Sequence, residues 1–127
     1  MAWQPYVDNL VASGYISKAA IHGLDGEVWA SSSDLLISAN EVDTILNALE
    51  GDVSMVAVNG ILLSGQHYMF LRSDPGSSIY GRKGDSGCCI VKTKKSVLIG
   101  IYGGGIQAGS ATVVVEKLGD YLKAQGF

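Results

Sequence analysis

Apolar residues recur at helical spacing in three stretches of the chain, which predicts three helices. The first covers residues 3–11, the second follows residue 38, and the third lies near residues 110–124. Ser38 followed three positions later by Glu41 is a capping box, which marks the start of the second helix. The three apolar stripes are Trp3, Tyr6, Val7, Leu10 and Val11; Val42, Ile45, Leu46 and Leu49; and Val114, Leu118, Tyr121 and Leu122.

Short apolar stretches bounded by turn residues predict the strands. We expect strands at residues 17–22, 27–31, 55–58, 61–63, 66–73, 78–81, 88–93 and 97–102. Their connections are short, as at Leu24-Asp25-Gly26 and Asn59-Gly60, and short connections join antiparallel neighbours. The order of elements therefore predicts one α+β domain over residues 1–127, in which helices cover an antiparallel sheet and the terminal helices lie together.

The composition is that of a folded protein. Of the 127 residues, 47% are hydrophobic and 17% are charged, which excludes a disordered chain. No apolar run approaches the roughly 20 residues of a membrane span. The first residues do not resemble a secretory signal, so we expect a cytosolic protein. Cys88 and Cys89 are adjacent, and we expect two reduced thiols, at least one of them buried.

The net charge of −3 hides an uneven distribution. Residues 1–71 carry a net charge of −7, residues 72–95 carry +4, and residues 96–127 carry none. The basic stretch can attract an acidic protein surface, anionic lipid or nucleic acid. Solvated strand ends and turns explain the same charges, and composition alone favours that interpretation.

Two short motifs suggest catalysis, but neither is complete. Gly84-Asp85-Ser86-Gly87 is similar to the sequence around the nucleophile of trypsin-like proteases, yet only His22 and His67 could supply its base. The glycines at 103–105 lack the spacing and the following βαβ units of a dinucleotide site. Two cysteines and two distant histidines make a poor zinc site. We therefore expect no enzymatic activity, no cofactor and no metal.

The aromatic residues are placed unusually. Trp3 and Tyr6 lie near one end of the chain, Tyr121 and Phe127 near the other, and Trp29 follows the first predicted turn. If the terminal helices pack together, these rings converge. They then either seal the contact between the helices or form an exposed groove. An aromatic groove would bind polyproline II segments, whose rings pack on flat aromatic faces while Trp and Tyr donate to ligand carbonyls.

Segments along the whole chain match one family in order. They are Trp3-Gln4-x-Tyr6-Val7-Asp8-Asn9-Leu10, Ala19-Ala20-Ile21, Gly26-x-x-Trp29-Ala30, Asn59-Gly60, Gly65-Gln66-x-Tyr68, Leu71-Arg72, Ser78-Ile79-Tyr80-Gly81-Arg82-Lys83, Val91-Lys92-Thr93, Gln107-Ala108-Gly109 and Val115-Glu116-Lys117-Leu118-x-Asp120-Tyr121-Leu122. Together they resemble the profilins, most closely the short profilins of amoebae and fungi. The resemblance implies a central antiparallel β-sheet sandwiched by the N- and C-terminal helices on one face and a further helix on the other.

The resemblance also implies function. It indicates a monomeric protein of the cytoplasm and cytoskeleton, not an enzyme, that binds monomeric actin and delivers it to filament assembly. It further implies binding of proline-rich partners such as formins, and of phosphoinositide lipids, with no role for nucleic acid. The loop at residues 73–78 departs from the family pattern, because Ser77 stands where relatives often carry Arg, and this weighs against phosphoinositide binding.

By position in the family, the polyproline groove would consist of Trp3, Tyr6, Asn9, Trp29, Tyr121, Leu122 and Phe127. The last position is more often Tyr in the family, so we expect weaker polyproline binding from the loss of one hydroxyl donor. The actin-binding face would consist of Arg72, Arg82, Lys83, Lys92, Gln107, Gly109, Thr112, Val113, Glu116 and Lys117. This face includes the basic stretch, which suits an acidic partner such as actin.

Two other functions remain open at this point. A small-molecule sensor domain could have a similar layout, and it would need an internal apolar pocket of about 300 Å³ or more. A phosphoinositide-binding surface protein could use Arg72, Arg82, Lys83 and Lys92.

Overall fold

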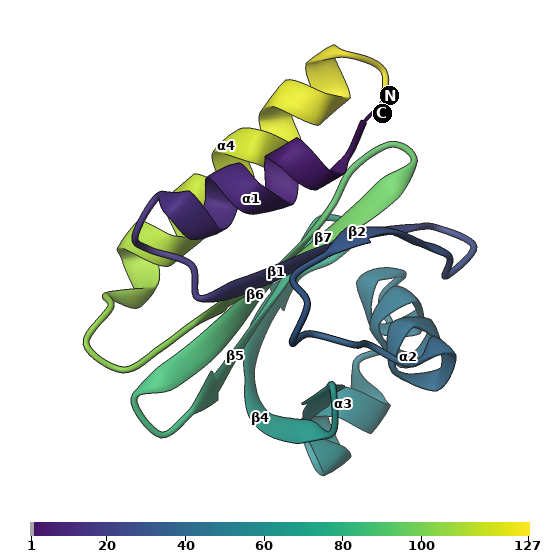
Figure 1. The fold of residues 1–127 in the computed structure, drawn as a ribbon. Coiled ribbons are helices and arrows are strands. Elements are labelled where there is room, and N and C mark those ends of the chain that lie inside the picture. Colours follow the sequence, from purple (N-terminus) through teal and green to yellow (C-terminus); the bar gives the residue numbers. More distant parts are fainter. Residues whose placement is uncertain (1) are drawn as a thin grey trace.

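The computed structural model describes residues 2–127, which form four helices and seven strands (Figure 1). The elements are α1 (Gln4–Ala12), β1 (Lys18–Gly23), β2 (Val28–Ser31), α2 (Ala39–Leu49), α3 (Ser54–Asn59), β3 (Ile61–Leu63), β4 (Gln66–Asp74), β5 (Ser78–Lys83), β6 (Ser86–Lys92), β7 (Ser96–Tyr102) and α4 (Ala108–Ala124). The three predicted helices are present, and Ser38 and Glu41 form the predicted capping box.

All seven strands belong to one sheet in the order β2-β1-β7-β6-β5-β4-β3. Every neighbouring pair is antiparallel, as the short connections predict. The antiparallel α+β fold is therefore confirmed.

Helices cover both faces of the sheet (Figure 1). α1 and α4 run antiparallel over one face, where Val7 and Val115 belong to a buried cluster with Leu98 of β7. α2 and α3 cover the other face, where Ile45 and Val56 belong to a second cluster. The second face thus carries two helices rather than the single further helix expected.

The strand predicted at residues 55–58 is wrong, because these residues lie in α3. The Asp52 carboxylate accepts hydrogen bonds from the backbone N–H (3.2 Å) and the hydroxyl (2.5 Å) of Ser54, which satisfies a donor of the first helical turn. Gly60 ends the helix with φ of +80°, so Asn59-Gly60 is a helix end and not a hairpin turn. A short run rich in valine fits either structure, so the sequence pattern alone does not distinguish them.

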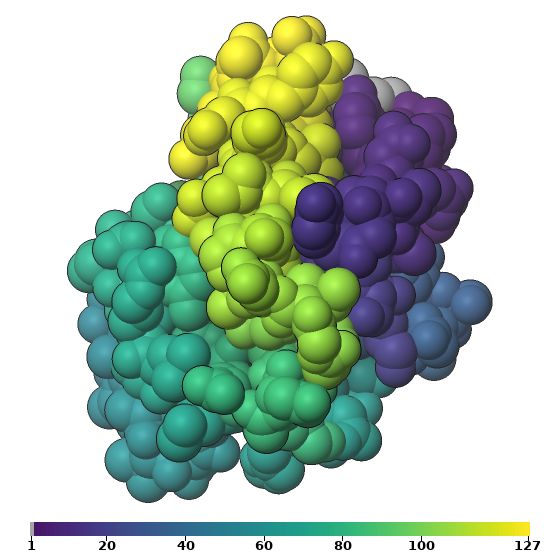
Figure 2. All heavy atoms as spheres, turned by 90° about the vertical axis from the view of Figure 1, so that its left-hand side faces the viewer, coloured from purple at the N-terminus to yellow at the C-terminus, as the bar shows by residue number. Residues whose placement is uncertain are grey.

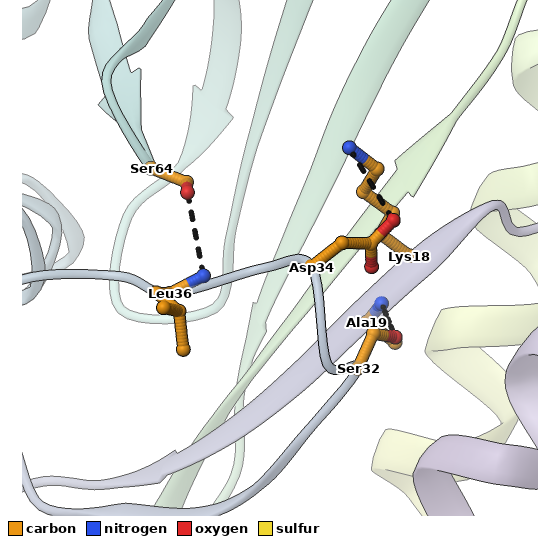
Figure 3. A network of polar contacts seen from close by, with 6 residues as sticks. All are labelled: Lys18, Ala19, Ser32, Asp34, Leu36 and Ser64. Atoms are coloured by element: carbon orange, nitrogen blue, oxygen red, sulfur yellow. Dashed lines mark hydrogen bonds and ion pairs between the residues drawn. The ribbon is translucent and has the colours of Figure 1, made fainter.

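The segment between β2 and α2 is tied to distant parts of the sheet (Figure 3). Ser32 Oγ accepts a hydrogen bond from a backbone N–H of β1 at 2.9 Å, and Ser64 Oγ in the β3–β4 turn accepts one from the Leu36 N–H at 3.3 Å. Lys18 and Asp34 add an exposed ion pair at 3.7 Å, which contributes little stability. The segment therefore connects β1 to the hairpin at the opposite edge of the sheet.

Glu41 fastens the same hairpin to α2. In the capping box, the Glu41 carboxylate accepts a hydrogen bond from the Ser38 N–H at 2.9 Å. The carboxylate also accepts from the N–H groups of Ser64 (2.9 Å) and Gly65 (3.0 Å) in the β3–β4 turn. One buried carboxylate thus satisfies three backbone donors from two parts of the chain.

Cys88 and Cys89 are free thiols, and both are buried, on opposite faces of β6. Burial raises the pKa of each thiol to about 12, so both stay protonated at neutral pH.

Glycines allow α4 to approach the sheet closely. A Cβ on Gly100 of β7 would lie 2.7 Å from Cγ2 of Val115, and one on Gly119 of α4 would lie 2.9 Å from Cγ1 of Val91. Both distances are shorter than carbon atoms tolerate, so the absence of a side chain at these positions sets the spacing between helix and sheet.

We expect Gly100→Ala to lower the free energy of unfolding by about 1–3 kcal/mol, because the added methyl overpacks the contact with Val115. Gly109→Ala is the control, since nothing lies within 4 Å of its added Cβ, and we expect it to leave stability unchanged or slightly raised. Urea unfolding of the three proteins measures the difference. Equal stability of Gly100→Ala and the wild type would contradict the close-packing argument.

Candidate functional site: an aromatic cluster and a polar surface beside α4

Five aromatic rings meet where the start of α1 and the end of α4 lie side by side. The Trp3 ring stacks on the Trp29 ring with centroids 4.6 Å apart, and meets the Phe127 ring edge-on at 5.1 Å. The Trp3 and Tyr6 centroids are 5.9 Å apart, and those of Tyr6 and Tyr121 are 6.1 Å apart. We call these five residues the aromatic cluster. Tyr121 is 49% exposed and the other four are half-buried, so every ring keeps some surface open to solvent.

Trp29 reaches this cluster because of a local irregularity in the β1–β2 ladder. Ile21 pairs with Ala30 and His22 pairs with Val28, which leaves Trp29 as an extra residue in a β-bulge. A bulge redirects the side chain of its extra residue. Gly23 completes the arrangement, because a Cβ there would lie 2.9 Å from the Trp29 indole nitrogen.

The other residues expected in the groove differ in their exposure. Asn9 is exposed on α1, about two helical turns after Trp3. Leu122 is fully buried in the core beneath α4, so its side chain supports the surface rather than forming it. The hydroxyls of Tyr6 and Tyr121 are joined by a hydrogen bond, which raises the pKa of Tyr6 above its usual value.

A second group of polar residues lies beside α4. The Arg72 guanidinium sits over the Tyr80 ring, 4.0 Å from its centroid, and the Tyr80 hydroxyl donates a hydrogen bond to the Glu116 carboxylate. Burial and this hydrogen bond raise the pKa of Tyr80 to about 12, so it remains a donor at neutral pH. Arg72 also pairs with Asp74 at 3.6 Å in an exposed ion pair.

A second β-bulge directs Arg72 to this surface. Phe70 pairs with Gly81 and Arg72 pairs with Tyr80, which leaves Leu71 as the extra residue. Paired residues project from the same face of a sheet, so Arg72 lies on the face of Tyr80. Figure 2 shows α4 crossing this side of the molecule, with α1 on one flank and sheet segments on the other.

The structure brings together part of the expected actin-binding set. Arg82 and Gln107 line one small cavity beside Tyr102, on the same face as Arg72. The members on the α4 side, which we call the α4 surface, are Arg72, Arg82, Gln107, Gly109, Thr112, Val113, Glu116 and Lys117.

Lys83 and Lys92 do not join them. Lys83 follows Arg82 on β5 and so projects from the opposite face, where its ammonium group donates to Gln66. Lys92 follows Val91 on β6 and likewise projects from the face of Ile90, toward the α2 side. The charge of residues 72–95 is therefore divided between the two faces of the sheet.

Sequence reasoning missed three residues on this side of the sheet: Tyr80, which is buried beneath the α4 surface, and Met69 and Leu71, which we add to that surface. Met69 is 62% exposed and Leu71 is 49% exposed, so apolar surface accompanies the charges. Tyr80 belongs to the segment Ser78-Ile79-Tyr80-Gly81-Arg82-Lys83, and the match of this segment to the family could have identified it. The exposure of Met69 and Leu71 could not be predicted, because it depends on α4 leaving β4 uncovered.

Residues 2–127 contain no group of three or more His, Cys, Asp or Glu side chains arranged to hold a metal ion. None of the helices formed by the described residues combines the length and apolar character that a membrane crossing requires.

A cavity of about 320 Å³ lies between α2 and α3, lined by Ile45, Met55, Val56 and Leu62 together with polar groups such as His67.

The structure is a small α+β domain with an antiparallel sheet, paired terminal helices and two separate surface clusters. The family model for Profilin matches residues 1–127, and the chain belongs to the profilin family. Profilin-1A of Acanthamoeba castellanii is 47% identical over 128 residues, which cover 100% of both chains. The crystal structure of A. castellanii profilin II has a TM-score of 0.93 and 46% identity, covering 98% of this chain and 99% of that one.

More distant profilins share the fold. Mouse profilin IIa, solved in complex with a double repeat from the FH1 domain of mDia1, has a TM-score of 0.83 at 23% identity, with 100% of both chains covered. Profilins are actin-binding proteins and not enzymes. They are cytoplasmic and associate with the cytoskeleton, as the sequence predicts for this protein.

The bond between the two tyrosines gives a direct test of the cluster's geometry. We expect Tyr6 to titrate above the usual value of 10.0, and Tyr121→Phe to bring its pKa back toward that value by removing the bond. The pH dependence of the Tyr6 ring signals in NMR measures both. A Tyr6 pKa that is the same in the two proteins would contradict the contact between α1 and α4 described here.

Proposed function

We propose that this protein binds monomeric actin on the α4 surface and proline-rich segments on the aromatic cluster, and so delivers actin subunits to filament assembly. The observation that carries the proposal is the aromatic cluster, in which residues from the two ends of the chain and from β2 combine while each ring keeps exposed surface.

The chemistry of the cluster suits a polyproline II ligand. Stacked and tilted rings offer flat apolar faces for proline rings. Trp and Tyr side chains supply N–H and O–H donors, and the carbonyls of a polyproline II helix have no internal partners. The ligand is stiff before it binds, so little conformational entropy is lost. Phe127 contributes a ring without a hydroxyl, which supports the expectation of weaker binding than a Tyr there would give.

The α4 surface suits a large protein partner. It combines exposed apolar side chains, such as Met69 and Val113, with the charges of Arg72 and Arg82. Charged groups of this kind raise the association rate with an acidic partner and make it sensitive to salt. The α4 surface uses residues 109–117 of α4, and the aromatic cluster uses Tyr121 farther along the helix. The two ligands would therefore contact different residues, so the protein can hold both at once.

Neither alternative function gains comparable support. Lys83 and Lys92 project away from Arg72 and Arg82, and Arg72 is paired with Asp74, so no concentrated basic patch collects for a phosphoinositide headgroup. The α2–α3 cavity reaches the size that a small-molecule sensor needs, but membership of the profilin family favours the actin-binding function.

The first test is titration with a proline decamer, followed by the fluorescence of Trp3 and Trp29, the only two tryptophans. We expect saturable binding, and we expect Trp3→Ala to raise the Kd at least about 30-fold, as truncation of a central aromatic contact does. Tyr15→Ala is the control, because Tyr15 is a 46% exposed aromatic residue outside the cluster. Full affinity in Trp3→Ala would rule out the cluster as the binding site.

The second test uses the division of basic residues between the two faces. We expect Arg72→Glu to raise the Kd for monomeric actin about tenfold at low salt, with the loss mainly in the association rate. Lys83→Glu makes the same charge change on the opposite face, and we expect a much smaller effect. Sedimentation or fluorescence assays with monomeric actin measure both, and equal losses in the two variants would argue against the α4 surface.

A further inference from the structure

The β6–β7 turn, residues 93–95, holds the backbone oxygen of Phe127. The Thr93 hydroxyl donates to this oxygen at 2.8 Å, and the Lys95 backbone N–H donates to it at 2.5 Å. The Phe127 N–H in turn donates to the Leu122 carbonyl at 2.8 Å. Both backbone groups of Phe127 are therefore fixed, one by the sheet and one by α4.

The protons in this turn can be assigned from the contacts. Thr93 is 3% exposed and Ser96 is fully buried, so each polar atom needs a partner within the protein. The Thr93 oxygen lies 2.5 Å from the Ser96 hydroxyl oxygen and accepts the Ser96 N–H at 3.1 Å. The Thr93 hydroxyl has one proton and two carbonyl oxygens within reach, that of Phe127 at 2.8 Å and that of Ser96 at 3.2 Å, and the shorter contact assigns the proton to Phe127. The Thr93 oxygen then accepts a hydrogen bond from the Ser96 hydroxyl. The Ser96 hydroxyl thus orients the Thr93 proton toward Phe127.

These hydrogen bonds from the β6–β7 turn to Phe127, which we call the anchor, lie next to the aromatic cluster. The Phe127 ring meets the Trp3 ring edge-on, with an interplanar angle of 87°, and the Lys95 ammonium lies 5.6 Å from the centroid of the Phe127 ring. The hydrogen bonds fix the backbone position from which the Phe127 ring projects, and the contacts with Trp3 and Lys95 lie on the ring itself.

We propose that Thr93 and Ser96 are positioning residues for the proline-binding aromatic cluster: they touch no ligand, and they hold Phe127 against Trp3 before the ligand arrives. This inference rests on the function proposed above for the cluster. Pre-ordering the ring lowers the entropy lost on binding, so the effect of the anchor is on ligand affinity.

The test compares variants that differ by one hydroxyl. We expect Thr93→Val to raise the Kd for a proline decamer about fivefold, the effect of losing one hydrogen bond, and Thr93→Ser to restore near wild-type affinity. Ser96→Ala keeps the Thr93 hydroxyl but removes the donor that orients it, so we expect its Kd for the decamer to lie between those of the two Thr93 variants. Ser38→Ala removes a hydroxyl contact at α2 on the opposite face of the sheet and should not change decamer affinity. Monomeric actin binding should be the same in all four variants.

A readout without ligand separates the anchor from the proposed function. In the free protein we expect Thr93→Val, but not Thr93→Ser, to shift the Trp3 indole signal in NMR and to speed hydrogen exchange of the Lys95 and Phe127 amides. Wild-type affinity in Thr93→Val would overturn the positioning role, as would an equal loss in Ser38→Ala. If the wild type does not bind the decamer, the function of the cluster is wrong, and unchanged NMR signals in Thr93→Val would show that the anchor is wrong as well.

Discussion

The close packing of α4 on β6 and β7 is the constraint on which both surfaces depend. Gly100 and Gly119 allow the helix to approach the sheet at two points along its length, through Val115 and Val91. The last turns of α4 then bring Tyr121 to the α1 aromatics, and the middle of the helix brings Glu116 to the Tyr80 hydroxyl. A helix held farther from the sheet would separate both groups, because each contact spans from α4 to another element.

Two β-bulges in the sheet place one further residue on each of the two surfaces. In a regular strand the side chains alternate, so neighbouring residues cannot serve the same face. The bulge at Trp29 places that ring beside α1, and the bulge at Leu71 places Arg72 on the face of Tyr80. Both irregularities add twist locally and carry residues of the proposed binding surfaces, which is where bulges are often found.

The division of charge shows how strand alternation limits what a basic sequence can do. The stretch at residues 72–95 has a net charge of +4, yet Arg82 and Lys83 project from opposite faces. Arg72 is partly neutralised by Asp74 and lies over an aromatic ring. The positive charge therefore accompanies apolar surface on the α4 side, an arrangement that suits a protein partner better than a highly charged lipid headgroup.

The sequence by itself determined the α+β class, most of the elements and the residues of the family, because hydrophobic periodicity, capping and turn residues are local signals. It misassigned residues 55–58, where a valine-rich run fits both strand and helix, and where the hydrogen bond from Ser54 to Asp52 lies just before the helix. The tertiary structure decided which face each basic residue occupies, since one bulge or one step along a strand reverses that face. It also decided that five aromatic rings from α1, β2, α4 and the residues that flank the two helices meet, and that the β6–β7 turn holds Phe127 in place. Those contacts join residues as far apart as Trp3 and Phe127, and their geometry depends on the packing of the whole sheet and α4.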